Sequence, residues 1–323
     1  MKKFLALALC LLMVVPTALV GCGDTAATVK FGAGVYVSTP STTDATEDKD
    51  GSGKLDVTVA AVTVDADGKI VACALDTASN TVSFTADGKA VANGEFKTKY
   101  EMGADYNMVA YGGATKEWFE QADAFEALVA GKTLDEVKAL VADANKGTEE
   151  VINAGCTIMI NEFVGAIEKA YAAASAEISA DAVVKVSLAT EQTCTDATEE
   201  KDGSNKVAVY TFASATDANG KILAASSDCV EVSFTFDMTG VSTLDTTKAV
   251  ASKREQGANY GMVAWGGSAK EWFEQADAFD AACIGKTAAE IAGLMGEDGK
   301  GVADLQTAGC TIYVSGFVKA ASK

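Results

Sequence analysis

The chain has 323 residues, with 26 Lys and Arg against 45 Asp and Glu, and it contains no histidine. Apolar residues make up 49% of the chain, which is enough for a buried core and excludes a disordered acidic tail. The absence of histidine excludes Ser-His-Asp and Cys-His catalysis and the His-ligated zinc and haem sites. A net charge of −19 without a cluster of Lys or Arg excludes nucleic acid as a partner. The length predicts about two domains, at roughly 150 residues each.

The first residues resemble a bacterial lipoprotein signal. Lys2 and Lys3 precede a short apolar stretch, and Leu19-Val20-Gly21-Cys22 has the form of a lipobox. The resemblance implies that residues 1–21 are removed, that Cys22 carries lipid, and that residues 22–31 tether the protein to the outside of the membrane. The alternative is an ordinary signal peptide with an incidental cysteine.

The remaining sequence contains one unit twice. Residues 103–127 and 257–281 are identical at 19 of 25 positions, and shorter matches lie on both sides of them. The period is too long for a solenoid, so each unit is expected to be a whole domain. We place the first repeat at 32–172, an Ala-rich linker at 173–182, and the second repeat at 183–323.

Each repeat begins with segments that favour strands. In the first repeat these segments are rich in β-branched residues, and they are Gly34–Thr39, Lys54–Val64, Lys69–Leu75 and Thr81–Thr85. Asp67-Gly68 and Asp87-Gly88 are dipeptides typical of hairpin turns.

Helices are predicted to follow these strands. Residues 116–130 carry apolar side chains at helical spacing and end at Gly131, a suitable C-terminal cap. Thr133 and Thr287 begin capping boxes of further helices. Residues 157–160 favour a strand, and a last helix is expected from Asn161, its cap, to about residue 171. Strands followed by helices predict an α+β fold with an antiparallel sheet in each repeat.

The loop before the first long helix is one candidate ligand site. It carries Tyr111 in the first repeat and Trp265 in the second, and each stands beside a glycine pair, Gly112-Gly113 or Gly266-Gly267. Flat aromatic rings in a loop suit a stacked ligand, and glycine permits close backbone approach. In contrast, Trp118 and Trp272 lie on the helix at core spacing. The alternative for the glycines is that they only form the turn.

An acidic segment has the spacing of part of an EF-hand. Asp48, Asp50, Ser52 and Asp56 fall at positions 1, 3, 5 and 9 of a calcium loop. Position 12 is Val59, where a bidentate glutamate is required, so a solvated acidic hairpin is the simpler interpretation.

The cysteines predict one disulfide. Cys194 and Cys229 occur together in the second repeat, and the first repeat has threonine at both positions. A cysteine pair that is present or absent as a unit is typical of a local disulfide, and an extracytoplasmic location permits one. Six cysteines outside the signal and the lipidation site allow fifteen connectivities, so the pairing is a hypothesis.

Two segments resemble the bacterial FMN-binding domain, in particular the membrane-anchored lipoproteins called major membrane immunogens. The first is Gly32 to Thr39 with the strands that follow it, and the second is Ala154-Gly155-Cys156-Thr157 with its counterpart at residues 308–311. The second resembles the flavinylation motif of that family, in which a hydroxyl takes FMN by a phosphoester bond. The resemblance implies cofactor-binding residues at Gly155, Thr157, Gly309 and Thr311. Val151 and Leu305 stand where the motif has an aspartate, and Ala154 and Ala308 stand where it has a serine or threonine.

These observations predict a non-enzymatic, lipid-anchored surface protein with two FMN-binding-like domains that binds a small ligand or a partner protein. One alternative is an extracytoplasmic electron carrier with FMN on Thr157, Thr311 or both. The other is a structural surface antigen without a ligand.

Overall fold

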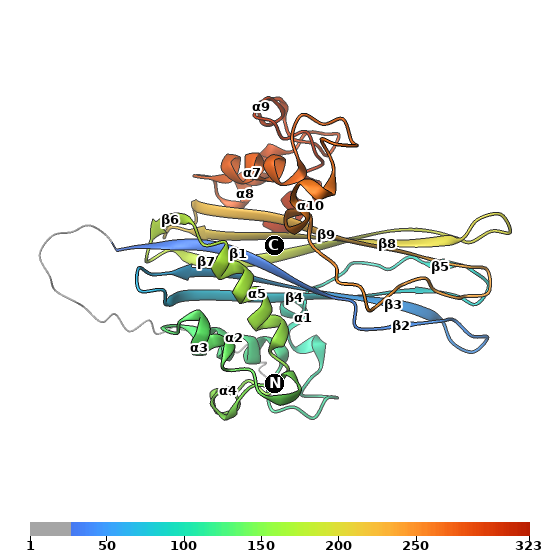
Figure 1. Ribbon diagram of the computed structural model, residues 1–323, viewed down its shortest axis with the longest axis horizontal. Helices are drawn as coiled ribbons and strands as arrows, with labels where there is room; N and C mark the ends of the chain where they lie inside the picture. Colours follow the sequence, from blue (N-terminus) through green and yellow to red (C-terminus); the bar gives the residue numbers. More distant parts are fainter. Residues whose placement is uncertain (1–26) are drawn as a thin grey trace, which may run out of the picture.

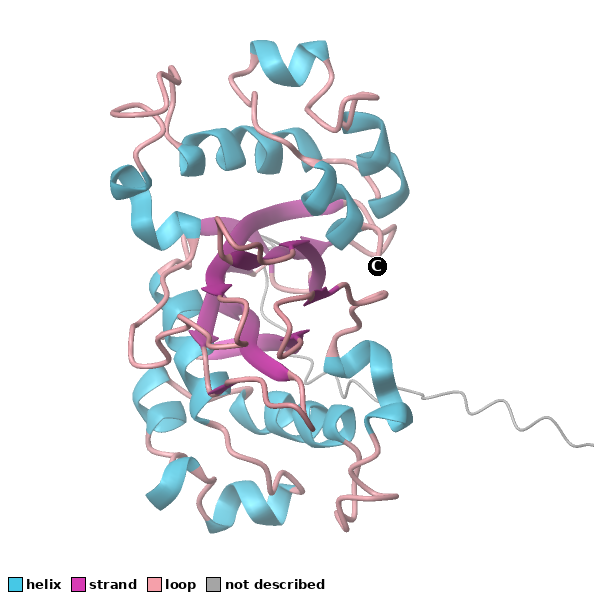
Figure 2. Ribbon diagram, turned by 90° about the vertical axis from the view of Figure 1, so that its right-hand side faces the viewer, coloured by secondary structure: helices cyan, strands magenta, loops and turns pink. Residues whose placement is uncertain are grey.

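The computed structural model describes residues 27–323, so the predicted signal peptide and Cys22 lie outside the described residues. Two antiparallel sheets lie face to face in the middle of the molecule, with helices on both outer sides (Figures 1 and 2). Each sheet is followed in the chain by its helices, which confirms the predicted α+β class.

The first sheet has the strand order β5-β4-β3-β1-β6, with β2 pairing with β3. The bounds are β1 (Thr28–Ser38), β2 (Thr42–Thr43), β3 (Gly51–Val64), β4 (Ile70–Phe84), β5 (Ala90–Val91) and β6 (Ala176–Ser179). The predicted strands at 69–75 and 81–85 are therefore one continuous strand, because β3 offers a pairing partner along its whole length. The second sheet is β7 (Val183–Thr195), β8 (Gly203–Thr216) and β9 (Ile222–Phe236).

The helices of the first repeat cover the outer face of the first sheet. They are α1 (Lys99–Met102), the 3-10 helix η1 (Gly103–Tyr106), α2 (Trp118–Val129), α3 (Leu134–Lys138), η2 (Asp143–Asn145), α4 (Glu149–Ala154) and α5 (Asn161–Ala172). The second repeat continues with α6 (Lys253–Gln256), η3 (Gly257–Tyr260), α7 (Trp272–Cys283), α8 (Ala288–Ile291), η4 (Ala292–Leu294), α9 (Ala303–Thr307) and α10 (Ser315–Ala321).

The turn and cap predictions are confirmed at several places. Gly68 and Gly88 have positive φ in the turns after β3 and β4, and Gly131 has φ 80° after α2. Thr133 and Thr287 each form a capping box with the glutamate three residues later.

Two local predictions are wrong. Asn161 is the first residue of α5 and not its cap, which is Ile160 without a side-chain hydrogen bond. Residues 157–160 are not a strand, because Met159 makes only a single bridge, to Lys146. Part of the predicted linker is regular structure, since β6 pairs with β1 and extends the first sheet.

The central strand β3 explains why the two sheets stack. Its side chains alternate, so Val57 and Val59 face the second sheet while Val62 and Val64 face the helices of the first repeat. Both faces are buried, as the nearly continuous apolar sequence of this strand requires. The core between the sheets includes the stacked rings of Phe84 and Phe236, whose centres lie 4.6 Å apart.

Candidate functional site

The segment Lys-Glu-Trp-Phe-Glu-Gln, present in both repeats, leads into a helix of 12 residues in each, α2 or α7. In the second repeat, Glu271 caps α7 and its carboxylate accepts hydrogen bonds from the backbone N–H groups of Met262 and Val263 at 3.0 and 3.4 Å. The cap therefore fixes the aromatic loop against the start of the helix. Glu117 does the same for Met108 and Val109 in the first repeat.

The glutamine of this segment fixes the predicted attachment residue. Gln275 is 1% exposed, and its Oε1 accepts hydrogen bonds from both the N–H and the Oγ1 of Thr311, at 2.8 and 2.9 Å. Gln121 makes the same two contacts with Thr157. Sequence reasoning missed the roles of these glutamines and of Glu117 and Glu271. The sequence signal that could have indicated these roles is that the same glutamate and glutamine occur in both repeats.

In the second repeat, three of the five predicted site residues, Trp265, Gly266 and Thr311, line one cleft of about 860 Å³, whereas Gly267 and Gly309 do not line it. Trp265 and Gly266 come from the aromatic loop, and Thr311 comes from the segment before α10. The remaining aromatic lining is Tyr210 from β8, Tyr260 from η3, Trp272 from α7, and Tyr313. A cleft of this size with several flat rings suits a planar organic ligand.

Lysines give this cleft its polar character. Lys206, Lys253 and Lys300 line it together with Glu191 and Glu231. Lys206 and Lys253 lie 2.9 and 3.1 Å from Glu231. Burial opposes ionisation of Glu231, but the two lysines outweigh it and lower its pKa. Three cations against two carboxylates make the cleft basic in a chain of net charge −19, which favours an anionic group on the ligand.

Lys253 is both one of the cations of the cleft and a neighbour of its aromatic rings. Its ammonium lies 5.0 Å from the ring centre of Tyr260 and 5.5 Å from that of Trp272. Its side chain is only 9% exposed, so this arrangement is desolvated and rigid.

The predicted exposure of the four repeat-paired aromatic side chains is observed: the two on the helices are buried, and the two in the loops are exposed. Trp118 and Trp272 are 3% and 4% exposed, which confirms that they belong to the cores of their repeats. Tyr111 and Trp265 are 88% and 83% exposed, so neither is a core residue. Trp272 has one further contact that the prediction did not include, because it also lines the cleft.

The glycine pairs serve the loop itself. A Cβ on Gly112 or Gly266 would lie 2.6 or 2.7 Å from the carbonyl oxygen of Met108 or Met262. Gly113 and Gly267 have φ of 69° and 65°. The turn interpretation therefore accounts for both pairs, and of these glycines only Gly266 is also part of the cleft wall.

The first repeat does not have the same wall. Tyr210 and Glu231 correspond to Thr58 and Ser79 in the repeat alignment, and Gly316 corresponds to Glu162. A Cβ on Gly316 would lie 2.3 Å from the Tyr210 ring, whereas Glu162 accepts hydrogen bonds from Ser38 and Thr58. Gly261, on whose backbone the Trp265 ring lies, is Asn107 in the first repeat. Thr157, Gly155 and Tyr111 are thus not surrounded by the residues that form the second-repeat cleft.

The two segments that were compared with a flavinylation motif have no acid at the position where the motif has an aspartate. Val151 and Leu305, at the aspartate position, are buried in the cores. Gly155 and Gly309, both with φ of 102°, end short helices, and a Cβ there would lie 2.2 or 2.3 Å from the ammonium of Lys116 or Lys270. The exposed hydroxyls of Thr157 and Thr311 thus have a lysine nearby and no carboxylate from the motif.

The predicted disulfide is not formed. Cys194 and Cys229 are free cysteines, on β7 and β9, with β8 between them. Cys194 lies opposite Asn205 of β8 and Cys229 lies opposite Tyr210, five residues away. At about 3.3 Å per residue this separates them by some 16 Å along the strand, well beyond disulfide reach. The two positions that have cysteine in the second repeat and threonine in the first are therefore at separate places in the second sheet.

The four calcium-loop candidates do not come together as one site: Asp48, Asp50 and Ser52 line a hollow at the hairpin, and Asp56 does not. Asp56 is buried in β3, where it accepts a hydrogen bond from Ser79 at 2.6 Å and pairs with Lys54. Ser52 pairs with Thr43, while Asp48 and Asp50 are exposed at the hairpin tip. Between residues 27 and 323 no group of three or more Cys, Asp or Glu is placed to hold a metal ion.

Within residues 27–323, no helix has both the length and the apolar character needed to cross a membrane. The chain matches no protein-family model, no curated protein and no solved structure.

Proposed function

We propose that this chain is a lipid-anchored extracytoplasmic protein made of two duplicated FMN-binding-like domains, and that its second domain binds a planar, anionic small molecule. The observation that carries the proposal is the second-repeat cleft, which brings Trp265 and Thr311 together with buried Lys253. Aromatic faces favour a flat ring system, and the lysines favour a phosphate or carboxylate.

FMN is the first ligand to test, since the resemblance of the domain and the chemistry of the cleft agree. Trp265, Tyr313 and Trp272 would contact its ring system, and Lys206, Lys253 and Lys300 would neutralise its phosphate. Bound flavin supplies one- and two-electron transfer, so an electron carrier is the second candidate function. Because the acid of the motif is replaced by buried Val151 and Leu305, the cleft fits a non-covalent flavin better than a phosphoester on Thr157 or Thr311.

A titration of purified protein with FMN and with riboflavin separates these possibilities. Quenching of tryptophan fluorescence by FMN, and at least tenfold weaker binding of riboflavin, supports a planar ligand that carries an anionic group. A flavin absorption band that survives denaturation and dialysis supports the carrier with covalent FMN. Absence of binding by either compound, in protein expressed with its signal, favours a structural surface antigen or a protein partner.

The anchor is tested separately. Cys22→Ala is expected to leave an uncleaved precursor or to release the protein from the membrane, since lipidation needs the thiol. A cleaved Cys22→Ala protein that still fractionates with membranes contradicts lipid anchoring. Either result leaves the ligand proposal untouched.

A further inference from the structure

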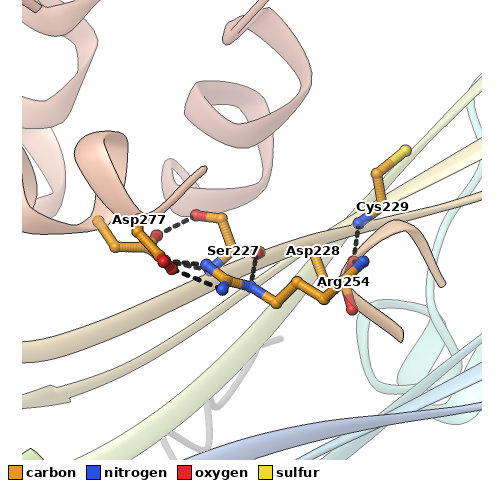
Figure 3. Close-up of polar contacts among 6 residues, drawn as sticks. Ser227, Asp228, Cys229, Arg254 and Asp277 are labelled. Carbon is orange, nitrogen blue, oxygen red and sulfur yellow. Dashed lines mark hydrogen bonds and ion pairs between the residues drawn. The ribbon is translucent and has the colours of Figure 1, made fainter. Parts of the chain in front are cut away.

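The second repeat contains a guanidinium held by acidic and carbonyl groups between sheet and helix. Arg254 donates to Asp277 and Asp280, each at 2.6 Å, and its Nε donates to the carbonyl oxygen of Ser227 at 2.7 Å. Figure 3 shows the guanidinium directed at Asp277 and Ser227. Asp280 is 7% exposed, whereas the Asp277 side chain is 58% exposed, so only the inner end of this cation site is desolvated, and the arginine of the protein itself occupies it.

The first repeat keeps the acids and lacks the arginine. In the repeat alignment, Asp277 and Asp280 correspond to Asp123 and Glu126, and Arg254 corresponds to Tyr100. Tyr100 donates its hydroxyl hydrogen to Asp123 and not to Glu126, which accepts a hydrogen bond from the N–H of Leu75 at 2.7 Å. Burial raises the pKa of Glu126 to about 8 because no cation offsets the loss of solvent.

A cavity of about 360 Å³ is lined by Tyr100 and Glu126, the counterparts of Arg254 and Asp280. It lies between the two repeats, with Leu75 and Asp76 of β4 on one side and Val184, Val186 and Leu188 of β7 on the other. Aliphatic side chains of β4 and β7 form part of its wall, and the carboxylates of Asp76, Glu101 and Glu126 line it as well. Asp76 is 5% exposed.

The other charged groups around the cavity do not neutralise Glu126. Lys323 lines the cavity but pairs with Glu101 of α1, with its ammonium 2.8 Å from Oε1. Lys185 of β7 also lines it and has no ion pair within 4.0 Å among the described residues. The three carboxylates that line the cavity, those of Asp76, Glu101 and Glu126, outnumber these two lysines.

We infer that the cavity between β4, α1, α2 and β7 binds a small alkylguanidinium compound, whose charged group takes the place that Arg254 fills in the second repeat. The planar guanidinium donates to Glu126, as Arg254 does to Asp280, and its alkyl chain lies against the aliphatic side chains of β7. This site is separate from the second-repeat cleft, and neither proposal depends on the other.

The test is calorimetric titration of the full-length protein in detergent with agmatine, which carries a guanidinium on an alkyl chain. At pH 8.5 one molecule is expected to bind per chain, and lowering the pH to 6 is expected to weaken binding at least tenfold because Glu126 then holds a proton. Putrescine, with ammonium groups only, is expected to bind several-fold more weakly.

Two variants identify the site. Tyr100→Arg supplies the missing guanidinium from within and is expected to abolish agmatine binding while raising the melting temperature. Glu126→Gln, which keeps the shape of the side chain, is expected to weaken binding at least tenfold. Glu297→Gln removes one negative charge from an exposed position and is the matched control, with unchanged binding. No binding at pH 8.5 by wild-type protein, or wild-type affinity in folded Glu126→Gln, would overturn the inference.

Discussion

Lys323 pairs with Glu101 across the boundary between the repeats, and the pair is repeated in reverse by Lys169 and Glu255. Lys169 and Lys323 are equivalent positions of the two repeats, as are Glu101 and Glu255. In each repeat, a lysine at or near the end of the last helix therefore forms an ion pair with a glutamate on the first short helix of the other repeat. The two copies form one reciprocal unit, and the core between the sheets lies at its centre.

We expect Phe236→Ala to destabilise both repeats together. Phe236 and Phe84 are fully buried and stack across the sheets, so truncation leaves a cavity that costs about 3–5 kcal/mol of unfolding free energy. Chemical denaturation followed by tryptophan fluorescence and by circular dichroism should show one shared transition at lower denaturant. Two separate transitions, with only one of them shifted, would show that the repeats unfold independently.

Asn80→Val is expected to stabilise the protein. Asn80 is 1% exposed, and within residues 27–323 neither its Nδ2 nor its Oδ1 has a hydrogen-bond partner. The second repeat has Val232 at this position. Removing an unsatisfied buried amide should raise the unfolding free energy by about 1–3 kcal/mol. The reciprocal variant Val232→Asn is the matched control and should lower it. A stability loss in Asn80→Val would mean that the amide has a partner in solution.

The pH dependence of stability should change in Glu126→Gln. The pKa of Glu126 is about 8 in the folded protein and near 4.5 when exposed, so the folded state binds its proton more tightly. Its contribution to stability is therefore lost as pH rises from about 4.5 to 8. The variant should match wild type near pH 4.5 and exceed it by about 2 kcal/mol or more at pH 8.5, at about 1.4 kcal/mol per pKa unit. The carboxyl groups of Asp76, Asp228 and Asp280 also have raised pKa values, of about 6. They therefore give the free energy of unfolding a pH dependence that is present in both wild type and the variant. Parallel curves would contradict the burial of Glu126.

The cysteines should be unlinked. Peptide mapping without reduction is expected to find Cys194 and Cys229 as separate thiols, because β8 lies between their strands. Native alkylation should modify half-buried Cys194 before the buried thiols of Cys156, Cys229, Cys283 and Cys310. Cys73 is also half-buried, but burial and the nearby Glu126 raise the pKa of its thiol well above its usual range, so it should react more slowly than Cys194. Burial also raises the pKa of Cys156 and Cys310 to about 11, which slows their reaction further. A Cys194–Cys229 peptide would contradict the register of the second sheet.

The sequence predicted the elements whose signals are local. Helix α2 with its glycine after the C-terminus, the capping boxes at Thr133 and Thr287, and the burial of Trp118 against the exposure of Tyr111 all follow from spacing and turn chemistry. The face-to-face packing of the sheets was not predictable. The apolar sequence of a strand such as β3 predicts that both of its faces are buried, but it does not indicate which elements cover them.

The candidate site was predicted in part for the same reason. The aromatic loop and Thr311 were found from motifs, and they line one cleft. The lysines come from β8, α6 and a late loop, and only the tertiary fold brings them to Trp265. The difference between the repeats depends on single exchanges, such as Gly316 against Glu162, whose effect on cleft shape appears only in three dimensions.

The measurement that tests the central claim most directly is FMN binding by Trp265→Ala and by its matched control Tyr111→Ala. Both side chains are exposed, so both variants should keep the melting temperature within a few degrees of wild type. The account predicts that Trp265→Ala binds FMN at least tenfold more weakly and that Tyr111→Ala binds like wild type, because only Trp265 belongs to the cleft with Lys253 and Thr311. Equal loss in both variants, or no loss in Trp265→Ala, would contradict a ligand site in the second repeat.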